Sequence, residues 1–354
     1  MNARNRTYSF ITVNPVWWFV FSLLILLAIM ALSDYSSFHF SSLHVITFAW
    51  IGSGLLIAHI LLNLKKYQQY CSAGLTRNIP ASIVKDMFQY LPYLLMAMLY
   101  DNIPLFQNSD QVKTDTVDLY LMRADEFLFW MQPTIYLQDY LNPYLVEYLM
   151  ASYTLFVMPY VFLMYLFQKG ERAVFNKALL AQVIASVIAI VCFIYLPAKG
   201  PRYLFDPANS IKYERMPRFE QKLEGVRIDA LYRVTGYESL YLLQYEAWNR
   251  LERIKTDCMP SMHAALYLLC LMFVLRYRKM MRRRYAAVLF WSVSCVSLIF
   301  SCVYLRYHWV VDVLAGVFVA VISYIAAELI IDRWSAAREH GAGRNERQTS
   351  GADR

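Results

Sequence analysis

The sequence predicts an all-α protein, a polytopic transmembrane helical bundle of about eight spans. Hydrophobic residues make up 58% of the chain and charged residues only 17%, whereas a soluble domain carries about a quarter charged residues. The apolar residues also gather in blocks of roughly 20 residues, the length that a helix needs to cross a bilayer. Composition and run length together therefore indicate an integral membrane protein.

Eight apolar runs are candidate spans, at residues 16–32, 43–64, 87–103, 145–167, 178–197, 262–276, 285–304 and 308–332. The first run is long for the core of a signal peptide and no small-residue cleavage site follows it, so we expect a retained helix. The third run is interrupted by Gln89, Pro92 and Asp101, but proline is tolerated in membrane helices.

The net charge of +8 is distributed as membrane orientation requires, which argues against a nucleic-acid partner. Lys and Arg are concentrated at both termini and in the loops at 65–85, 169–177 and 276–284, whereas the loop at 33–42 has none. The positive-inside rule therefore predicts a multi-pass cell-membrane protein with both termini in the cytoplasm. The stretch 198–259 carries both signs and falls outside, which is compatible because long loops translocate largely regardless of charge.

Two segments on the predicted outer side are more than linkers. Residues 118–140 and 237–254 mix aromatic and acidic residues at helical spacing and are too polar to span. Trp and Tyr favour the membrane interface, so both segments predict interfacial helices. Two interpretations stay open: surface helices that pack on the bundle, or a lid over a site.

Two histidines mark the place where chemistry is expected. His263 lies at the outer end of the sixth run and His308 at the outer end of the eighth. Ionisable residues in membrane segments are costly and are therefore functional candidates. Asp312 follows His308 by four positions, which on a helix places both side chains on one face. A carboxylate there holds the imidazole tautomer and stabilises its charged form, as a nucleophilic histidine requires.

Cations near these histidines indicate the electrophile. Lys199 and Arg202 follow the fifth run, Arg306 precedes the nucleophile candidate, and Ser261 begins the sixth helix. With two helix N-termini at the same depth, these groups predict a cradle for a phosphate. His263 would then protonate the leaving oxygen as a general acid. Each feature alone also fits a structural role, such as a snorkelling anchor or a helix cap, and only their convergence favours catalysis.

Metal and cofactor ligands are not evident in the sequence. The six cysteines form no cluster of metal-site spacing, and no acidic pair accompanies the histidines. We therefore expect metal-free chemistry without a cofactor.

These motifs resemble the type 2 phosphatidic acid phosphatase superfamily over residues 86–332. The resemblance rests on Lys199 with Arg202, then Pro260-Ser261-Met262-His263, then His308 with Asp312. It implies that His308 attacks phosphorus and becomes a phosphohistidine. It further implies that Asp312 supports this histidine and that His263 serves the leaving group.

Three departures from the usual family pattern are present. Met262 stands where the family has glycine, and Cys302 stands where it has an arginine six residues before the nucleophile. Arg306 is the candidate to replace that arginine. Arg202 follows Lys199 by only three residues. With these departures, the motifs resemble those of the branch that contains inositol phosphorylceramide synthase and related lipid head-group transferases.

The resemblance implies a three-part organisation. Residues 1–85 form an N-terminal two-helix membrane extension, 86–332 the catalytic membrane core, and 333–354 a disordered cytoplasmic tail rich in Gly, Arg and Glu. The expected activity is transfer of a phosphoryl-type group from a membrane lipid or lipid-linked phosphate at the extracytoplasmic face. Transfer to water would make the protein a lipid phosphatase, and transfer to an alcohol a head-group transferase. The rival is a non-catalytic lipid-binding or transport protein; an ion channel is disfavoured because the apolar runs carry almost no ionisable residues.

Overall fold

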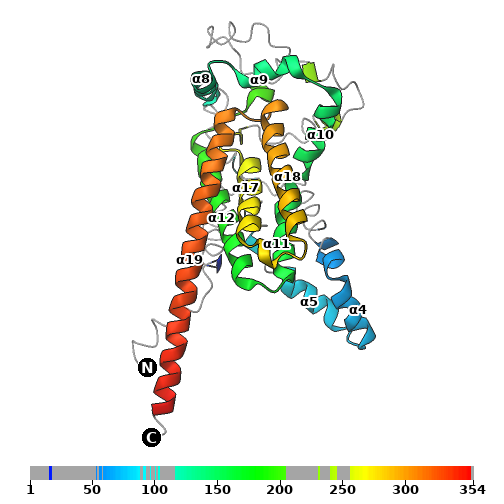
Figure 1. The fold of residues 1–354 in the computed structure, drawn as a ribbon, viewed down its shortest axis with the longest axis vertical. Coiled ribbons are helices and arrows are strands. Elements are labelled where there is room, and N and C mark those ends of the chain that lie inside the picture. Colours follow the sequence, from blue (N-terminus) through cyan, green and yellow to red (C-terminus); the bar gives the residue numbers. More distant parts are fainter. Residues whose placement is uncertain are drawn as a thin grey trace, which may run out of the picture.

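The computed structural model describes residues 59–87, 116–204 and 256–351, with short pieces at 16–17, 91–92, 230–231 and 240–244 and a few further residues between 53 and 103. Regular secondary structure in these ranges is helical throughout, and the isolated bridge between Ala198 and Asp257 is the extended pairing found there. The predicted all-α class is therefore confirmed for the described part of the chain (Figure 1).

Four helical segments are long and apolar enough to cross a membrane. The first is built from α10 (Pro143–Thr154), η4 (Leu155–Val157) and α11 (Met158–Gln168), and the others are α12 (Arg172–Tyr195), α18 (Arg284–Tyr304) and the apolar part of α19 (Val310–Gly351). They correspond to the predicted spans at 145–167, 178–197, 285–304 and 308–332. The multi-pass architecture is confirmed.

The predicted sixth span is helix α17 (Met262–Arg276), which has 15 residues. At about 1.5 Å per residue it is about 22 Å long, shorter than a hydrocarbon core of about 30 Å. It lies at the centre of the bundle, where it packs against α12, α18 and α19 (Figure 1). The predicted spans at 16–32, 43–64 and 87–103 lie wholly or largely outside the described residues, so the total of eight stays a prediction.

A proline bends the first spanning segment. Pro159 has no amide hydrogen, and its ring crowds the carbonyl of residue 155, so the chain tightens into η4 before α11 begins. The Leu155 carbonyl instead accepts a hydrogen bond from the Tyr267 hydroxyl of α17. The bend is therefore stabilised by the central helix.

Shorter helices surround the bundle. Four of them lie nearest the start of α17: α8 (Asp118–Phe129), α9 (Pro133–Tyr136), η3 (Leu137–Tyr140) and α13 (Pro201–Leu204). Three lie nearer its other end: α4 (Leu64–Ser72), α5 (Asn78–Met87) and η6 (Arg278–Met280). Figure 1 shows α8 and α9 lying across one end of the bundle. Helix α8 packs against α19, as the surface-helix interpretation expects.

The C-terminal segment is part of helix α19 (Val310–Gly351), and the expected division of the chain at residue 333 stays a prediction. Helix α19 continues through Gly351, and its last part projects beyond the bundle (Figure 1). The segment after residue 332 contains no proline and several alanine, arginine and glutamate residues, all of which have high helix propensity.

Candidate active site

The two candidate histidines lie side by side at one end of the bundle. His263 is in the first turn of α17, and His308 lies just before α19. Their ring centroids are 5.7 Å apart, with the ring planes inclined by 60°. An anion of phosphate size can therefore contact both rings at once.

The turn between α18 and α19 positions His308. Arg306 has a φ of 62°, a left-handed conformation typical of the residue that ends a helix. The chain folds back so that the Tyr307 and His308 amides both donate to the Cys302 carbonyl, at 2.9 and 2.8 Å. The last turn of α18 therefore holds the main chain of the candidate nucleophile.

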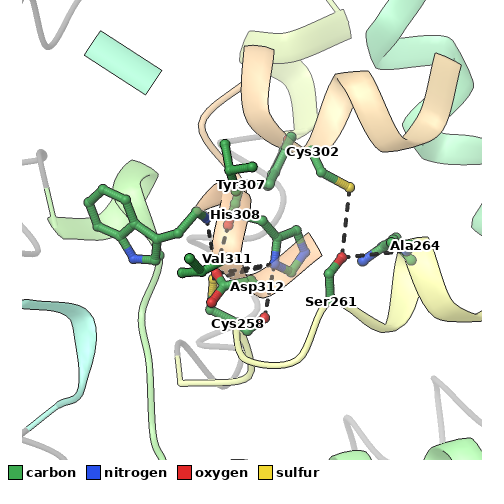
Figure 2. A network of polar contacts seen from close by, with 12 residues as sticks. Cys258, Ser261, Ala264, Cys302, Tyr307, His308, Val311 and Asp312 are labelled. Carbon is green, nitrogen blue, oxygen red and sulfur yellow. Dashed lines mark hydrogen bonds and ion pairs between the residues drawn. The ribbon is translucent and has the colours of Figure 1, made fainter. Parts of the chain in front are cut away.

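A backbone carbonyl determines the tautomer of His308. Its Nδ1 lies 2.9 Å from the carbonyl oxygen of Cys258, and both groups are buried (Figure 2). Because a carbonyl oxygen only accepts, Nδ1 carries the hydrogen of the neutral ring. Nε2 then carries the lone pair and is the ring nitrogen available to act as a nucleophile.

Asp312 lies near His308 but in a different arrangement from the expected one. Helix α19 begins at Val310, so the two side chains do not share a helical face. The Asp312 Oδ2 atom is 3.8 Å from His308 Nδ1. It accepts hydrogen bonds from the Trp309 amide at 2.9 Å and from the Cys258 thiol at 2.7 Å (Figure 2). Asp312 is therefore within reach of a charge interaction with the imidazole, whereas the Cys258 carbonyl is within hydrogen-bond distance of it.

The start of α19 is already occupied by carboxylates. Asp125 of α8 accepts from the Val310 and Val311 amides, at 2.9 and 2.8 Å. Together with the bond from Asp312 to the Trp309 amide, this satisfies the first donors of the helix. We expected two helix N-termini to bind a phosphate. This is corrected for α19, because its first amides already donate to protein carboxylates. Burial raises the pKa of Asp125 to about 6, against the effect of its two amide bonds.

A second carboxylate of α8 holds the segment that follows α12. Asp118, which is 1% exposed, accepts from the Lys199 and Gly200 amides, both at 2.8 Å, and from Trp309 Nε1 at 3.0 Å. Burial raises the pKa of Asp118, opposed by these hydrogen bonds. A Cβ on Gly200 would lie 2.6 Å from the Tyr307 carbonyl oxygen, so only glycine permits this approach.

Sequence reasoning did not assign these two acidic residues to the site. The available signal was their spacing of seven residues, which places Asp118 and Asp125 on one helical face together with the apolar Leu121 and Met122. Carboxylates on an apolar face indicate buried acceptors rather than a solvated surface.

An aromatic stack joins the histidines to a cation. The Tyr153 ring stacks on His263 with centroids 4.3 Å apart, and on Tyr307 at 4.0 Å. The Arg202 guanidinium lies 4.8 Å from the Tyr307 centroid and 5.0 Å from that of Tyr241. Arg202 is buried, and its amide donates to the Arg306 carbonyl at 2.7 Å. Arg202 therefore lies beside the turn between α18 and α19 that carries His308.

The other predicted phosphate ligands contact the site in different ways. Ser261 caps α17 through its hydroxyl, which accepts from the Ala264 amide at 3.4 Å, and its own amide donates to the Asp312 carbonyl at 3.0 Å. Its hydroxyl also lies 3.9 Å from the Cys302 sulfur (Figure 2). Lys199 joins the site through the main-chain bond to α8.

Arg306 is oriented by the short helix η3. Its guanidinium donates to the Gln138 side-chain oxygen at 3.1 Å. That Arg306 replaces the arginine that the family has at the position of Cys302 remains a prediction.

One group of side chains among the described residues could hold a metal ion. Ligand atoms of Cys258, His308 and Asp312 lie within 4.8 Å of one another, and all three residues are buried. Thiolate, imidazole and carboxylate would suit Zn²⁺. Burial, followed by the charge of Asp312, raises the pKa of the Cys258 thiol well above its usual range, which favours the thiol that donates to that carboxylate. Metal-free chemistry stays a prediction, which a chelator tests.

The helices and the site define a class of protein, a multi-pass membrane bundle whose paired histidines suit transfer of a phosphoryl group. Residues 119–326, more than half of the chain, match the PAP2 superfamily. The chain belongs to this superfamily, which indicates phosphatase or phosphotransferase chemistry on a membrane-embedded helical protein. No curated protein and no solved structure matches the chain.

Proposed function

We propose that this protein transfers a phosphoryl-type group from a membrane lipid or lipid-linked phosphate, with His308 as the nucleophile. The observation that carries the proposal is the pair of imidazole rings with centroids 5.7 Å apart, one of which is held with Nε2 unprotonated. Simple binding of a phosphate does not require an oriented imidazole, so this geometry favours catalysis over a non-catalytic lipid-binding or transport role.

The proposed reaction has two displacement steps. His308 Nε2 attacks phosphorus, the bond from phosphorus to the leaving oxygen breaks, and His263 supplies the proton to that oxygen. The resulting phosphohistidine carries positive charge on its ring, which Asp312 stabilises from 3.8 Å. Neutral His263 then takes a proton from the acceptor, whose oxygen attacks phosphorus as the bond to nitrogen breaks. Lys199, Arg202 and Arg306 are proposed to balance the charge on the phosphoryl oxygens, and the Ser261 hydroxyl to donate a hydrogen bond to one of them.

Exposed aromatic side chains support a lipid substrate. Near the site, Tyr120, Phe127, Trp130 and Tyr144 are 70%, 82%, 94% and 85% exposed. Aromatic side chains of this kind favour the level of the lipid head groups, which supports a site that a head group can enter. The basic loops at the other end of the bundle support an extracytoplasmic site with both termini in the cytoplasm.

The acceptor is proposed to be an alcohol rather than water. The support is the resemblance of the motifs, with Met262 and Cys302 at their positions, to the inositol phosphorylceramide synthase-like branch. The test is turnover of labelled phospholipids in the presence and absence of candidate alcohols, with products read by mass spectrometry. Product that forms only with an alcohol is expected; release of the phosphorylated group to water at the same rate would show a phosphatase. Binding without turnover under all conditions would contradict the proposal, and inhibition by a chelator would contradict metal-free chemistry.

Cys258 is predicted to be a positioning residue that acts through Asp312. Cys258→Ala removes the donor that lies 2.7 Å from Asp312 Oδ2, and we expect turnover to fall by about fivefold to tenfold, the value of one hydrogen bond. Cys258→Ser keeps a donor and should restore most of the rate. Cys270→Ala is the matched control, because this buried thiol lies further along α17. Equal rates in the Ala and Ser variants would contradict the role.

A further inference from the structure

A hollow lies at the end of α17 that is distant from the histidines. Its volume is about 730 Å³. The lining residues come from the last turns of α17, from η6 and from α19, and are Met272, Leu275, Arg276, Tyr277, Arg278, Lys279, Met280 and Tyr324. The 15 residues of α17 separate it from His263 by about 20 Å, at about 1.5 Å per residue. It is therefore a different site from the one described above.

The hollow is strongly basic. Arg276, Arg278 and Lys279 are exposed, the lining contains no acidic residue, and none of the three cations forms an ion pair with another described residue. Because no described residue forms an ion pair with these three cations, they are available to an anionic ligand.

The nearest acidic side chains are engaged elsewhere. Lys177 forms ion pairs with Glu328 at 2.6 Å and with Asp332 at 2.7 Å. The Tyr277 hydroxyl, from the wall of the hollow, donates to Glu328 at 2.7 Å. This cluster fixes Tyr277 in the wall, and both carboxylates are paired with Lys177.

One wall of the hollow is apolar. Leu275 is 41% exposed and Met272 is half-buried, so both present hydrocarbon beside the cations. A small free anion has no apolar surface to bury against such a wall. A ligand with a phosphate at one end and acyl chains at the other matches both halves.

We propose that this hollow binds one anionic phospholipid of the leaflet opposite the candidate active site. Its head-group phosphate contacts Arg276, Arg278 and Lys279, and its chains lie along Met272 and Leu275. Basic pockets between membrane helices recognise anionic head groups in this way. The hollow is lined by α17 and α19, the two helices whose N-terminal ends lie at the histidine site.

The test uses the full chain in detergent, with binding of phosphatidylglycerol measured by native mass spectrometry and by the rise in melting temperature. The variant R276Q/R278Q/K279Q is compared with R282Q/R283Q/R284Q, which removes three cations from the same loop outside the hollow. We expect the first variant to bind phosphatidylglycerol roughly 100-fold more weakly, because each cation near an anionic lipid contributes roughly fivefold. The second should bind within about threefold of the wild type, since its cations do not line the hollow.

Three results would overturn the proposal. Equal weakening in both variants would show general attraction to a basic loop. Stabilisation by inorganic phosphate equal to that by the lipid would show a site for a free anion. Binding of phosphatidylcholine with the same affinity would show that charge does not select the ligand. None of these readouts depends on turnover, so they are independent of the proposed reaction.

Discussion

His308→Ala is expected to lower turnover of a phospholipid substrate by about 10⁴-fold or more, the loss typical of removing a nucleophile. The remaining charges can still bind the phosphate, so affinity for a substrate analogue should change far less than turnover. The measurement is product formation in detergent micelles, together with binding of inorganic phosphate, which the cations hold without a bond to the nucleophile. His340→Ala is the matched control, because this histidine lies far along α19 from the site.

The folded state should survive this substitution. The main chain at His308 is held by its amide bond to the Cys302 carbonyl, and the neighbouring Trp309 amide by Asp312. The imidazole contributes one hydrogen bond, to the Cys258 carbonyl, which is worth about 1 kcal/mol. A melting temperature within a few degrees of the wild type is therefore expected. Activity at the wild-type level in a folded His308→Ala protein would refute the mechanism.

The spans illustrate what run length alone can predict. The runs at 262–276 and 285–304 agree closely with α17 and α18, because the bilayer sets a minimum apolar length whatever the helix packs against. The start of α19 was predicted two residues too early. Its boundary depends on which groups satisfy the first amides, and one of those groups, Asp125, belongs to a segment almost 200 residues away in the chain.

In the candidate site, too, some features could be predicted from the sequence and others depend on contacts between distant segments. The approach of His263 to His308 followed from placing two helix ends at one membrane depth, and the structure brings the rings together. The partners of the imidazole could not be predicted in this way, because a main-chain carbonyl such as that of Cys258 leaves no signal in a sequence. Spacing suggested Asp312 as the orienting group, but spacing applies only within a continuous helix.

Substitution of His263 should separate the two chemical steps. His263→Ala is expected to lower turnover of a phospholipid by about 10²-fold to 10⁴-fold, the usual contribution of a general acid or base. The structural basis is the position of this ring, 5.7 Å from His308 and stacked on Tyr153 at 4.3 Å. A lipid alkoxide is a poor leaving group, so formation of the phosphohistidine becomes slow and no intermediate accumulates.

A nitrophenyl phosphate substrate changes which step is limiting. Its leaving group is a stable anion that needs no proton, so the first step no longer requires His263. Transfer from the phosphohistidine still requires a base to activate the acceptor. The His263→Ala protein should therefore show a burst of nitrophenol close to one equivalent per site, followed by a slow steady rate and an acid-labile, alkali-stable phosphoenzyme. His308→Ala should show neither the burst nor the phosphoenzyme. Equal losses on both substrates without a burst would remove His263 from the protonation of the leaving group, and the roles of the two rings would have to be assigned differently.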